Sequence, residues 1–299
     1  MLLDLPYLGK ILSLSCAIIW ATAVILFKKS GETVHPLGLN LFKNLLGLVL
    51  FLPTFMVLGE RLIVGAPLKD YLLLLASGVI GIGLADTLFF KSLNLLGAGL
   101  SAIVNCLYSP FIIGLAVLFL SEGMSGLQLF GVFLIITAVF TVSQLKEKTH
   151  ISRHDLILGI LLGVLAMALM AIGIVMIKPL LDRSPLLWVI EVRLLAGCGI
   201  LGIILWFYPG RQRIMASVLS VRNWRYMLPG SFVGAYLALV VWMGGMKYTE
   251  MSIASALNQT SNIFVFILAA IFLKEPVNFQ RTAGIILAIV GVVMVAFFR

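Results

Sequence analysis

Residues 105–122 read NCLYSPFIIGLAVLFLSE, and residues 258–275 read NQTSNIFVFILAAIFLKE. The two stretches align without a gap, and each runs from an Asn to a terminal Phe-Leu-X-Glu. A second apolar stretch follows each copy, with Gly131 and Gly284 at matching places. The chain is therefore interpreted as two copies of one helical unit.

The composition places both copies in a lipid bilayer. Of the 299 residues, 62% are hydrophobic and 11% are charged, whereas soluble domains are about 45–50% apolar and about 25% charged. Residues 156–177 and 251–273 contain no charged side chain. Each run approaches the roughly 20 residues that a helix needs to cross a bilayer. The runs lack the alternating polarity of barrel strands, which favours helices.

The predicted fold class is an all-α membrane protein with ten transmembrane helices in two inverted five-helix repeats. The predicted spans are 10–28, 37–58, 71–90, 99–120, 126–144, 156–178, 185–207, 226–246, 251–273 and 279–298. The domains are predicted as 9–145 and 156–298, joined by a polar linker at 146–155. An odd number of spans makes the second copy enter the membrane from the opposite side, the inverted repeat common in secondary transporters.

Several function classes are excluded by missing motifs. The sequence contains no G-x-x-x-x-G-K-[ST] phosphate-binding motif, so the chain alone is not an ATP-driven pump. It also contains no H-E-x-x-H metal-binding motif and no apparent catalytic triad, so neither an enzyme nor a bound cofactor is predicted. Cys16, Cys106 and Cys198 lie scattered in apolar runs, which disfavours a disulfide framework and a metal site. The net charge of +9 falls in short loops, which indicates contact with anionic lipid head groups and not with nucleic acid.

Ionisable residues inside the spans are candidates for charge recognition or coupling, because such groups are costly in a membrane. Lys43 and Arg193 occupy matching places in the two copies. Either they attract an anionic or carboxylate-bearing substrate, or they pair with carboxylates or carbonyls as structural groups. Asp86 is interpreted either as a proton site, since burial raises a carboxyl pKa, or as a hydrogen-bonded structural residue.

Polar and aromatic side chains at membrane depth predict a cavity. Six polar residues occur within residues 255–262, and the matching copy carries a similar patch in which Pro110 predicts a kink. The alternative is hydrogen bonding between helices. The predicted cavity residues are Trp20, Asp86, Phe90, Asn105, Tyr108, Tyr236, Trp242, Asn258, Gln259 and Asn262.

Residues close to the span ends have more structural interpretations. Trp188, Trp206 and Trp224 fit an interfacial aromatic belt. Glu122 and Glu275 close their spans, where a carboxylate gains nothing from the helix dipole. A compensating partner is therefore expected, such as a backbone amide in the first turn of the next helix.

With these residues identified, nearly the whole chain resembles the drug/metabolite transporter superfamily, and specifically its ten-span members with two EamA domains. The resemblance is carried by Trp20, by Lys43 and Arg193, and by the Phe-Leu-X-Glu motifs at 119–122 and 272–275. It implies a secondary transporter, often an exporter, whose first, third, fourth, sixth, eighth and ninth spans surround a central cavity. Small four-span relatives use a glutamate in the first span to export cationic drugs. This chain has no acid there, which puts cation antiport by that residue in doubt.

The leading hypothesis is a secondary active transporter that exports small metabolites, such as amino acids or related polar or amphipathic compounds, by alternating access. The expected location is a bacterial inner (plasma) membrane, where a monomer suffices for a path and the substrate gradient or protons supply energy. The alternatives are a flippase for lipids or lipid-linked sugars and a non-transporting scaffold. The Lys and Arg distribution favours both termini outside, whereas the resemblance implies both in the cytoplasm.

Overall fold

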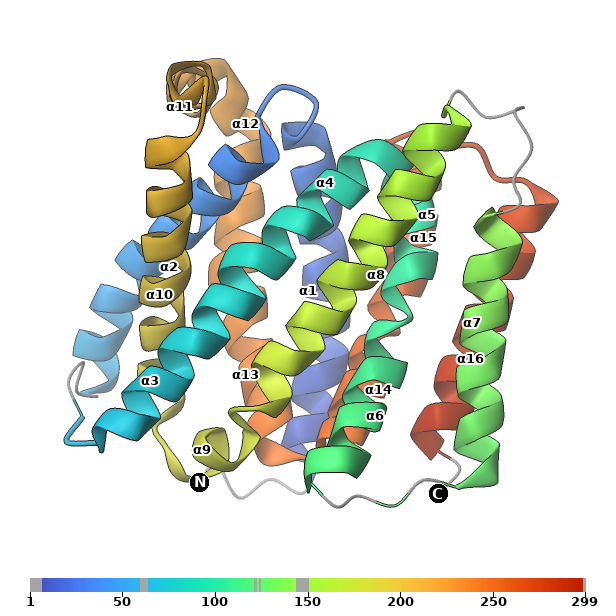
Figure 1. The fold of residues 1–299 in the computed structure, drawn as a ribbon, viewed down its shortest axis with the longest axis horizontal. Coiled ribbons are helices and arrows are strands. Elements are labelled where there is room, and N and C mark those ends of the chain that lie inside the picture. The colour runs from blue at the N-terminus through green and yellow to red at the C-terminus, as the bar shows by residue number, and fades with distance from the viewer. Residues whose placement is uncertain (1–6, 60–63, 121–122, 124, 144–150, 298–299) are drawn as a thin grey trace.

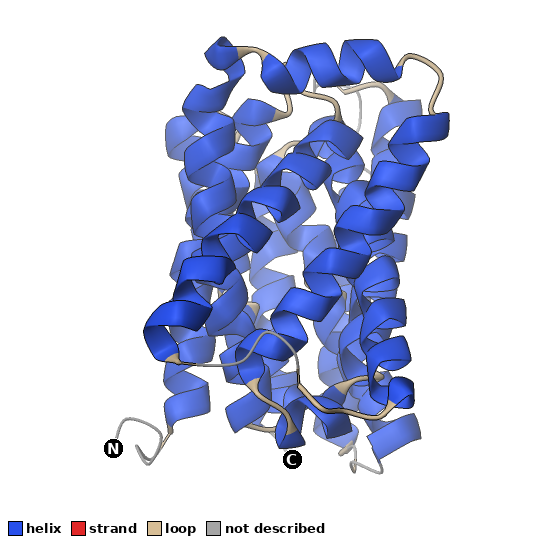
Figure 2. Cartoon of the chain, turned by 90° about the vertical axis from the view of Figure 1, so that its left-hand side faces the viewer, coloured by secondary structure: helices blue, strands red, loops and turns tan. Residues whose placement is uncertain are grey.

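The computed structural model describes residues 7–59, 64–120, 123, 125–143 and 151–297. These residues form helices that run side by side, and no strand occurs among them (Figures 1 and 2). Glu122 and the linker residues 146–150 lie outside the described residues. In chain order the elements are α1 (Leu8–Ser30), α2 (Pro36–Leu58), α3 (Leu68–Ser77), η1 (Gly78–Ala85), α4 (Asp86–Leu96), α5 (Ala98–Asn105), α6 (Tyr108–Leu120), α7 (Gly126–Ser143), α8 (Arg153–Val175), α9 (Lys178–Arg183), α10 (Leu186–Phe207), α11 (Arg211–Leu219), α12 (Val221–Ser231), η2 (Phe232–Leu237), α13 (Ala238–Tyr248), α14 (Met251–Asn258), α15 (Ser261–Phe272) and α16 (Phe279–Phe297).

Among the described residues, eight helical stretches are long and apolar enough to cross a membrane. They are Leu8–Ser30, Pro36–Leu58, Leu68–Leu96, Ala98–Phe119, Arg153–Val175, Leu186–Phe207, Val221–Tyr248 and Met251–Phe272. The other two predicted spans fall on the shorter apolar helices α7 and α16. Length and composition within the described chain therefore give eight membrane-crossing stretches and not ten.

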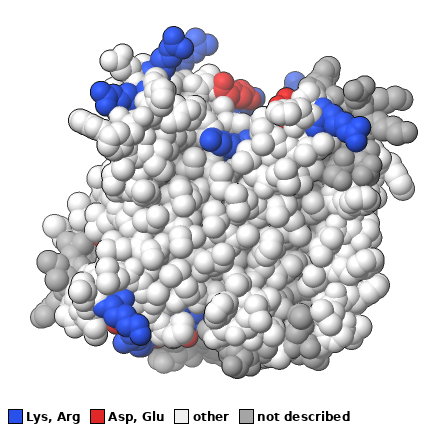
Figure 3. Space-filling model, viewed as in Figure 1, with Lys and Arg blue, Asp and Glu red and all other residues white. Residues whose placement is uncertain are grey.

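Charged side chains gather at the two ends of the bundle and leave an uncharged belt between them on the face drawn in Figure 3. Such a belt matches the hydrocarbon layer of a membrane. The short helix α11 lies across one end, seen end-on in Figure 1 and lengthwise in Figure 2. Helix α1 begins and α16 ends at the opposite end (Figure 1).

Two of the three tryptophans predicted for an aromatic belt lie on the surface of the bundle. Trp206 is 69% exposed and Trp224 is 38% exposed, which is compatible with the prediction. Trp188 is only 1% exposed, and its ring packs edge-on against Tyr71 with the centroids 5.1 Å apart. The position of Trp188 near a span end does not predict its burial, because the first turn of α10 packs against α3.

Two spans contain a π-helical segment that the sequence analysis did not predict. Segment η1 joins α3 to α4, and η2 joins α12 to α13, at equivalent places in the two copies. These two spans are longer than expected, at 29 and 28 residues. The backbone of η1 approaches α8 closely, since a Cβ on Gly173 would lie 3.2 Å from the Cα of Gly81. Single π turns inside helices often occur at functional sites.

Two further spans are broken in the middle, again at equivalent places. Helix α5 ends at Asn105 and α6 begins at Tyr108, whereas α14 ends at Asn258 and α15 begins at Ser261. The first break agrees with the kink predicted from Pro110, whose ring would clash with the carbonyl four residues earlier. The second break contains no proline. There the hydroxyl of Thr260 donates to the carbonyl of Leu257 at 2.7 Å, which offers the backbone an alternative to the helix.

Glu275 joins the second copy to the first. Its carboxylate accepts from the backbone N–H groups of Ala98 at 2.6 Å and Gly99 at 2.9 Å, in the first turn of α5. The expected partner was a backbone amide of the next helix; the structure supplies first-turn amides from the other copy. A helix N-terminus favours a carboxylate because its free N–H groups carry partial positive charge. Arg281 lies 3.8 Å away from the same carboxylate.

Helices α7 and α16 pack along each other at one side of the bundle (Figure 1). Their closest approach is between Gly131 and Gly291, because a Cβ on either would lie 2.6 Å from the carbonyl oxygen of the other. Close approach through small residues is common between membrane helices. Gly131, which has a matching glycine in the sequence repeat, therefore allows α7 to pack closely against α16.

We predict that Gly131→Ala destabilises the protein although alanine is the better helix former. The new methyl group would overlap a carbonyl oxygen, and overpacking of this kind costs about 1–3 kcal/mol. The matched control is Gly199→Ala on α10, where a Cβ would meet nothing within 4 Å. Thermal unfolding in detergent should show a lower midpoint for Gly131→Ala only. Equal midpoints would contradict the packing assignment.

Candidate functional site

A cavity of about 110 Å³ lies in the centre of the bundle. It has room for several water molecules, since each needs about 10–15 Å³ on this measure. Ten sequence-predicted residues line it together. They are Trp20, Lys43, Asp86, Asn105, Tyr108, Arg193, Trp242, Asn258, Gln259 and Asn262. Both π segments and both helix breaks also border the cavity, so the four backbone irregularities converge on one place.

Two predicted cavity residues, Phe90 and Tyr236, do not line this cavity. The ring of Phe90 packs against Phe27, with the centroids 5.1 Å apart, and its neighbour Phe89 borders the cavity instead. The hydroxyl of Tyr236 forms a 2.7 Å hydrogen bond with Thr54 of α2. Both residues lie in or just beyond a π segment, which rotates the helix face relative to a regular α-helix.

The sequence analysis missed part of the apolar wall, including Met167 and Met170 of α8 and Leu239 of α13. These side chains look like ordinary membrane-facing residues in the sequence. Only their helical spacing relative to Gly163 and Gly173, which face neighbouring helices, could have indicated that α8 turns this face inward. Methionine fills irregular gaps well because its side chain is flexible and polarizable.

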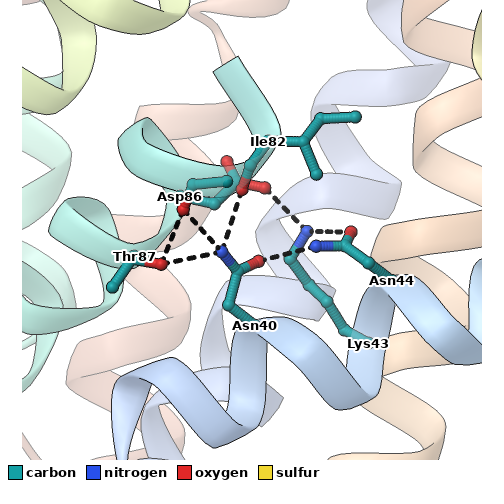
Figure 4. A network of polar contacts seen from close by, with 7 residues as sticks. Asn40, Lys43, Asn44, Ile82, Asp86 and Thr87 are labelled. Atoms are coloured by element: carbon teal, nitrogen blue, oxygen red, sulfur yellow. Dashed lines mark hydrogen bonds and ion pairs between the residues drawn. The ribbon is translucent and has the colours of Figure 1, made fainter. Parts of the chain in front are cut away.

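Lys43 and Asp86 form a buried ion pair between α2 and α4 (Figure 4). The ammonium nitrogen of Lys43 lies 2.7 Å from Asp86 Oδ2 and 2.9 Å from Asn44 Oδ1. Their side chains are 7% and 12% exposed. The structural interpretation of Lys43, in which the base pairs with a carboxylate, therefore describes this conformation. Asp86 is likewise engaged by a partner.

The same network contains Asn40, which the sequence analysis did not single out. Its amide nitrogen donates to the carbonyl oxygens of Ile82 at 2.9 Å and Gly83 at 3.2 Å, both in η1 (Figure 4). Its side-chain oxygen accepts from Asn44 at 2.9 Å. Asn40 thus satisfies carbonyl groups of the π segment, which is the requirement for irregular backbone at membrane depth.

Arg193 occupies the repeat position that matches Lys43 but is bound quite differently. Arg193 is 2% exposed. Its Nη1 donates at 3.0 Å to the thioether sulfur of Met243, and such a sulfur is a weak acceptor. Its guanidinium carbon lies 5.9 Å from the ring centre of Trp242. The Nε has no hydrogen-bond partner, and no carboxylate of the described residues lies within 4.0 Å of the guanidinium.

The two helix breaks meet at the cavity and are hydrogen-bonded to one another. The amide of Gln259 donates to the carbonyl of Asn105 at 2.7 Å, where α5 ends. Asn262 donates to Gln259 Oε1 at 2.7 Å and to Cys106 Sγ at 3.3 Å. Hydrogen bonding between helices therefore accounts for Gln259 and Asn262, although both also border the cavity. The Oδ1 of Asn258, by contrast, has no partner in the described chain.

An all-helical bundle with an uncharged belt, and a central cavity lined by charged, polar and aromatic side chains, is the architecture expected of a multi-pass membrane transporter. The family comparison agrees: the chain belongs to the EamA-like transporter family, whose model matches residues 7–144 and 157–297. The resemblance to the drug/metabolite transporter superfamily is thereby confirmed.

Individual relatives are similar over almost their whole length. An uncharacterized transporter from Archaeoglobus fulgidus is 25% identical over 284 residues, which cover 95% of this chain and 96% of that protein. A protein of known crystal structure superposes with a TM-score of 0.68 at 15% identity, covering 94% of this chain and 96% of its own. This likeness supports the fold and says nothing of the substrate.

We predict that Gln259→Leu destabilises the protein more than Asn258→Leu. The first change removes the donor to the Asn105 carbonyl, a bond between two spans that contributes about 0.6–2 kcal/mol. It also removes the acceptor of Asn262 within the same span. The second change removes an oxygen that has no partner. Thermal unfolding of the two purified variants is the measurement. A larger loss for Asn258→Leu would show that the hydrogen bonds between the breaks are unimportant for stability.

We also predict that Lys43→Gln alone is more harmful than Lys43→Gln combined with Asp86→Asn. The single change leaves a buried carboxylate without its cation, which costs about 3–5 kcal/mol, whereas removing both charges avoids that penalty. Folded yield and unfolding midpoint should fall in the single variant and largely recover in the double one. Additive losses would mean that the two charges do not stabilise each other.

Proposed function

We propose that the protein is a secondary active transporter that exports a small polar or amphipathic metabolite, with amino acids and related compounds as the leading class. The observation that carries the proposal is the central cavity, bordered by both helix breaks and both π segments. Discontinuous helices at the midplane are a recurrent way to build a transport site, because they present unpaired polar groups to a substrate. The proposed location is the plasma membrane, and one chain encloses the whole path.

Two inverted five-helix halves are proposed, with α7 and α16 completing ten spans. The equivalent placement of irregularities supports this arrangement. Each half contains a π segment, in η1 or η2, in the span that directly precedes its broken span. The Phe-Leu-X-Glu motif then ends each broken span. A duplicated unit with an odd number of spans would place these features on opposite sides of a two-fold axis in the membrane plane.

Contacts between the proposed halves occur at both ends of the bundle, as alternating access requires. At one end, Nη2 of Arg183 in α9 donates to both carboxylate oxygens of Asp70 in α3, each at 2.8 Å. At the other end, Glu275 accepts from the first turn of α5. Rocking of one half against the other would break the contact at one end while the contact at the other end remains formed.

Transport is tested by flux of radiolabelled metabolites into proteoliposomes, with Asn258→Leu as the cavity variant. We expect substrate flux in the native protein and at least a tenfold loss in the variant, because the leucine would fill the cavity and remove a polar group. The outward control is Gly199→Ala, which faces away from the cavity. Movement of a labelled lipid without flux of any soluble metabolite would support a flippase instead.

Proton coupling through Asp86 is proposed as the energy source and has a separate test. An imposed pH gradient should accelerate flux in the native protein. If Asp86 carries the proton, Asp86→Asn should remove this acceleration, because an amide side chain does not take up a proton near neutral pH. Flux that still follows the pH gradient in Asp86→Asn would leave the substrate gradient or another group as the energy source.

A further inference from the structure

We propose that the cavity recognises a single carboxylate on a molecule with an apolar body, and that Arg193 is the residue that binds this carboxylate. The inference rests on the proposed transport function and names the chemical class of its substrate.

The charge of the cavity wall favours an anionic ligand. Three acidic or basic residues of the described chain line the cavity: Lys43, Asp86 and Arg193. Lys43 and Asp86 form an ion pair at 2.7 Å, so their charges cancel within the wall. One positive charge remains. A ligand that complements the cavity therefore contributes one negative group, whereas a cationic ligand would meet an uncompensated cation in a low-dielectric interior.

Arg193 has hydrogen-bonding capacity that the described residues do not satisfy. The residue is 2% exposed, and within the described part of the chain its Nε has no partner and its Nη1 has only the thioether of Met243. A guanidinium has five N–H donors in a planar fork that matches the two oxygens of a carboxylate. Burying an arginine without an anion is costly in a membrane protein. A bound carboxylate would supply the missing acceptors.

Glu191 does not provide that anion. It lies two residues before Arg193 on α10, so it points from a different face of the helix. It does not line the cavity, and no ion pair joins it to Arg193 in the described chain. Tyr108, in contrast, does line the cavity, and its hydroxyl has no hydrogen-bond partner among the described residues. It offers a second donor to an anionic group held by Arg193.

The rest of the wall is apolar and rich in aromatic and thioether groups. The indole of Trp242 lies beside the guanidinium, with 5.9 Å between the ring centre and Cζ. Trp20, Phe89, Met167 and Met170 face the same space. These side chains fit an apolar body that extends from the carboxylate, because aromatic and sulfur-containing surfaces pack well against aliphatic and aromatic groups.

The test is equilibrium binding of three matched probes to the purified full chain. 3-Phenylpropionate carries the carboxylate, 3-phenylpropionamide is its neutral isostere, and 3-phenylpropylamine is the cationic counterpart. Tryptophan fluorescence reports binding directly, since Trp20 and Trp242 line the cavity. A ligand that binds the folded state also raises the unfolding midpoint. We expect the carboxylate to bind at least tenfold more tightly than the amide or the amine.

Four variants test whether Arg193 supplies the charge that binds the carboxylate. Arg193→Gln should lower carboxylate affinity at least tenfold, whereas the double variant Lys43→Gln/Asp86→Asn, which leaves the net charge of the wall unaltered, should lose less. Arg222→Gln on the exposed start of α12 is the matched control and should bind as the native protein does. If Arg193→Gln does not fold, Arg193→Lys keeps the charge without the fork, and its affinity should fall severalfold.

Several results would overturn the proposal. They are absence of carboxylate binding by the native protein, equal binding of the amide or amine, and undiminished carboxylate binding by whichever Arg193 variant folds. These outcomes differ from failure of the transport function. Flux of neutral or cationic solutes alone would refute the carboxylate inference and keep the transporter, whereas carboxylates that bind but never cross liposome membranes would refute transport and keep the binding site.

Discussion

The structure depends on one constraint: a backbone group that leaves the helical pattern inside a bilayer has to find its hydrogen bond within the protein. This chain leaves the pattern four times near its centre, at two π segments and two helix breaks. Gln259 donates to the carbonyl freed at Asn105, and Asn40 donates to carbonyl oxygens of η1. Several polar side chains at membrane depth are therefore required by the backbone itself. The cavity forms where they gather, so the irregularities create both the space and its polar lining.

Lys43 and Arg193 occupy matching places in the sequence but have different surroundings. Lys43 is neutralised by Asp86, and the pair is tied into a network with Asn44 and Asn40 (Figure 4). Arg193 has a sulfur atom, an aromatic face and an unpaired Nε around it. A lysine is a point charge that one carboxylate satisfies, whereas the arginine fork retains donors after any single contact. The two matching positions thus hold one structural cation and one cation with free binding capacity, which makes the site asymmetric.

Much of this site follows from the sequence, and the misplaced residues share a physical cause. The charge-free runs predicted helices, the repeated Phe-Leu-X-Glu motif predicted two copies of one unit, and Pro110 predicted the first helix break. Each of these predictions depends only on residues that are close together in the sequence. The π segments have no comparable signature. An extra residue in a helical turn rotates the face that follows, so Phe89 borders the cavity where Phe90 was predicted, and Tyr236 turns toward Thr54. Trp188 was assigned to lipid from its distance to the span end, whereas its burial depends on the packing of α10 against α3.

The two contacts at the ends of the bundle, Arg183 with Asp70 and Glu275 with the first turn of α5, differ in strength. This difference affects the order in which they could break. Arg183 is 62% exposed, and ion pairs that are this accessible to water contribute about 0–1 kcal/mol. Glu275 is 15% exposed and accepts two backbone N–H groups at a helix N-terminus, where hydrogen bonds to a charged group contribute about 1.5–3 kcal/mol each. The contact between Asp70 and Arg183 is therefore the weaker of the two. If the two halves rock as proposed, the cavity would open first toward the side of α9, and the Glu275 contact would open only when substrate binding offsets its loss.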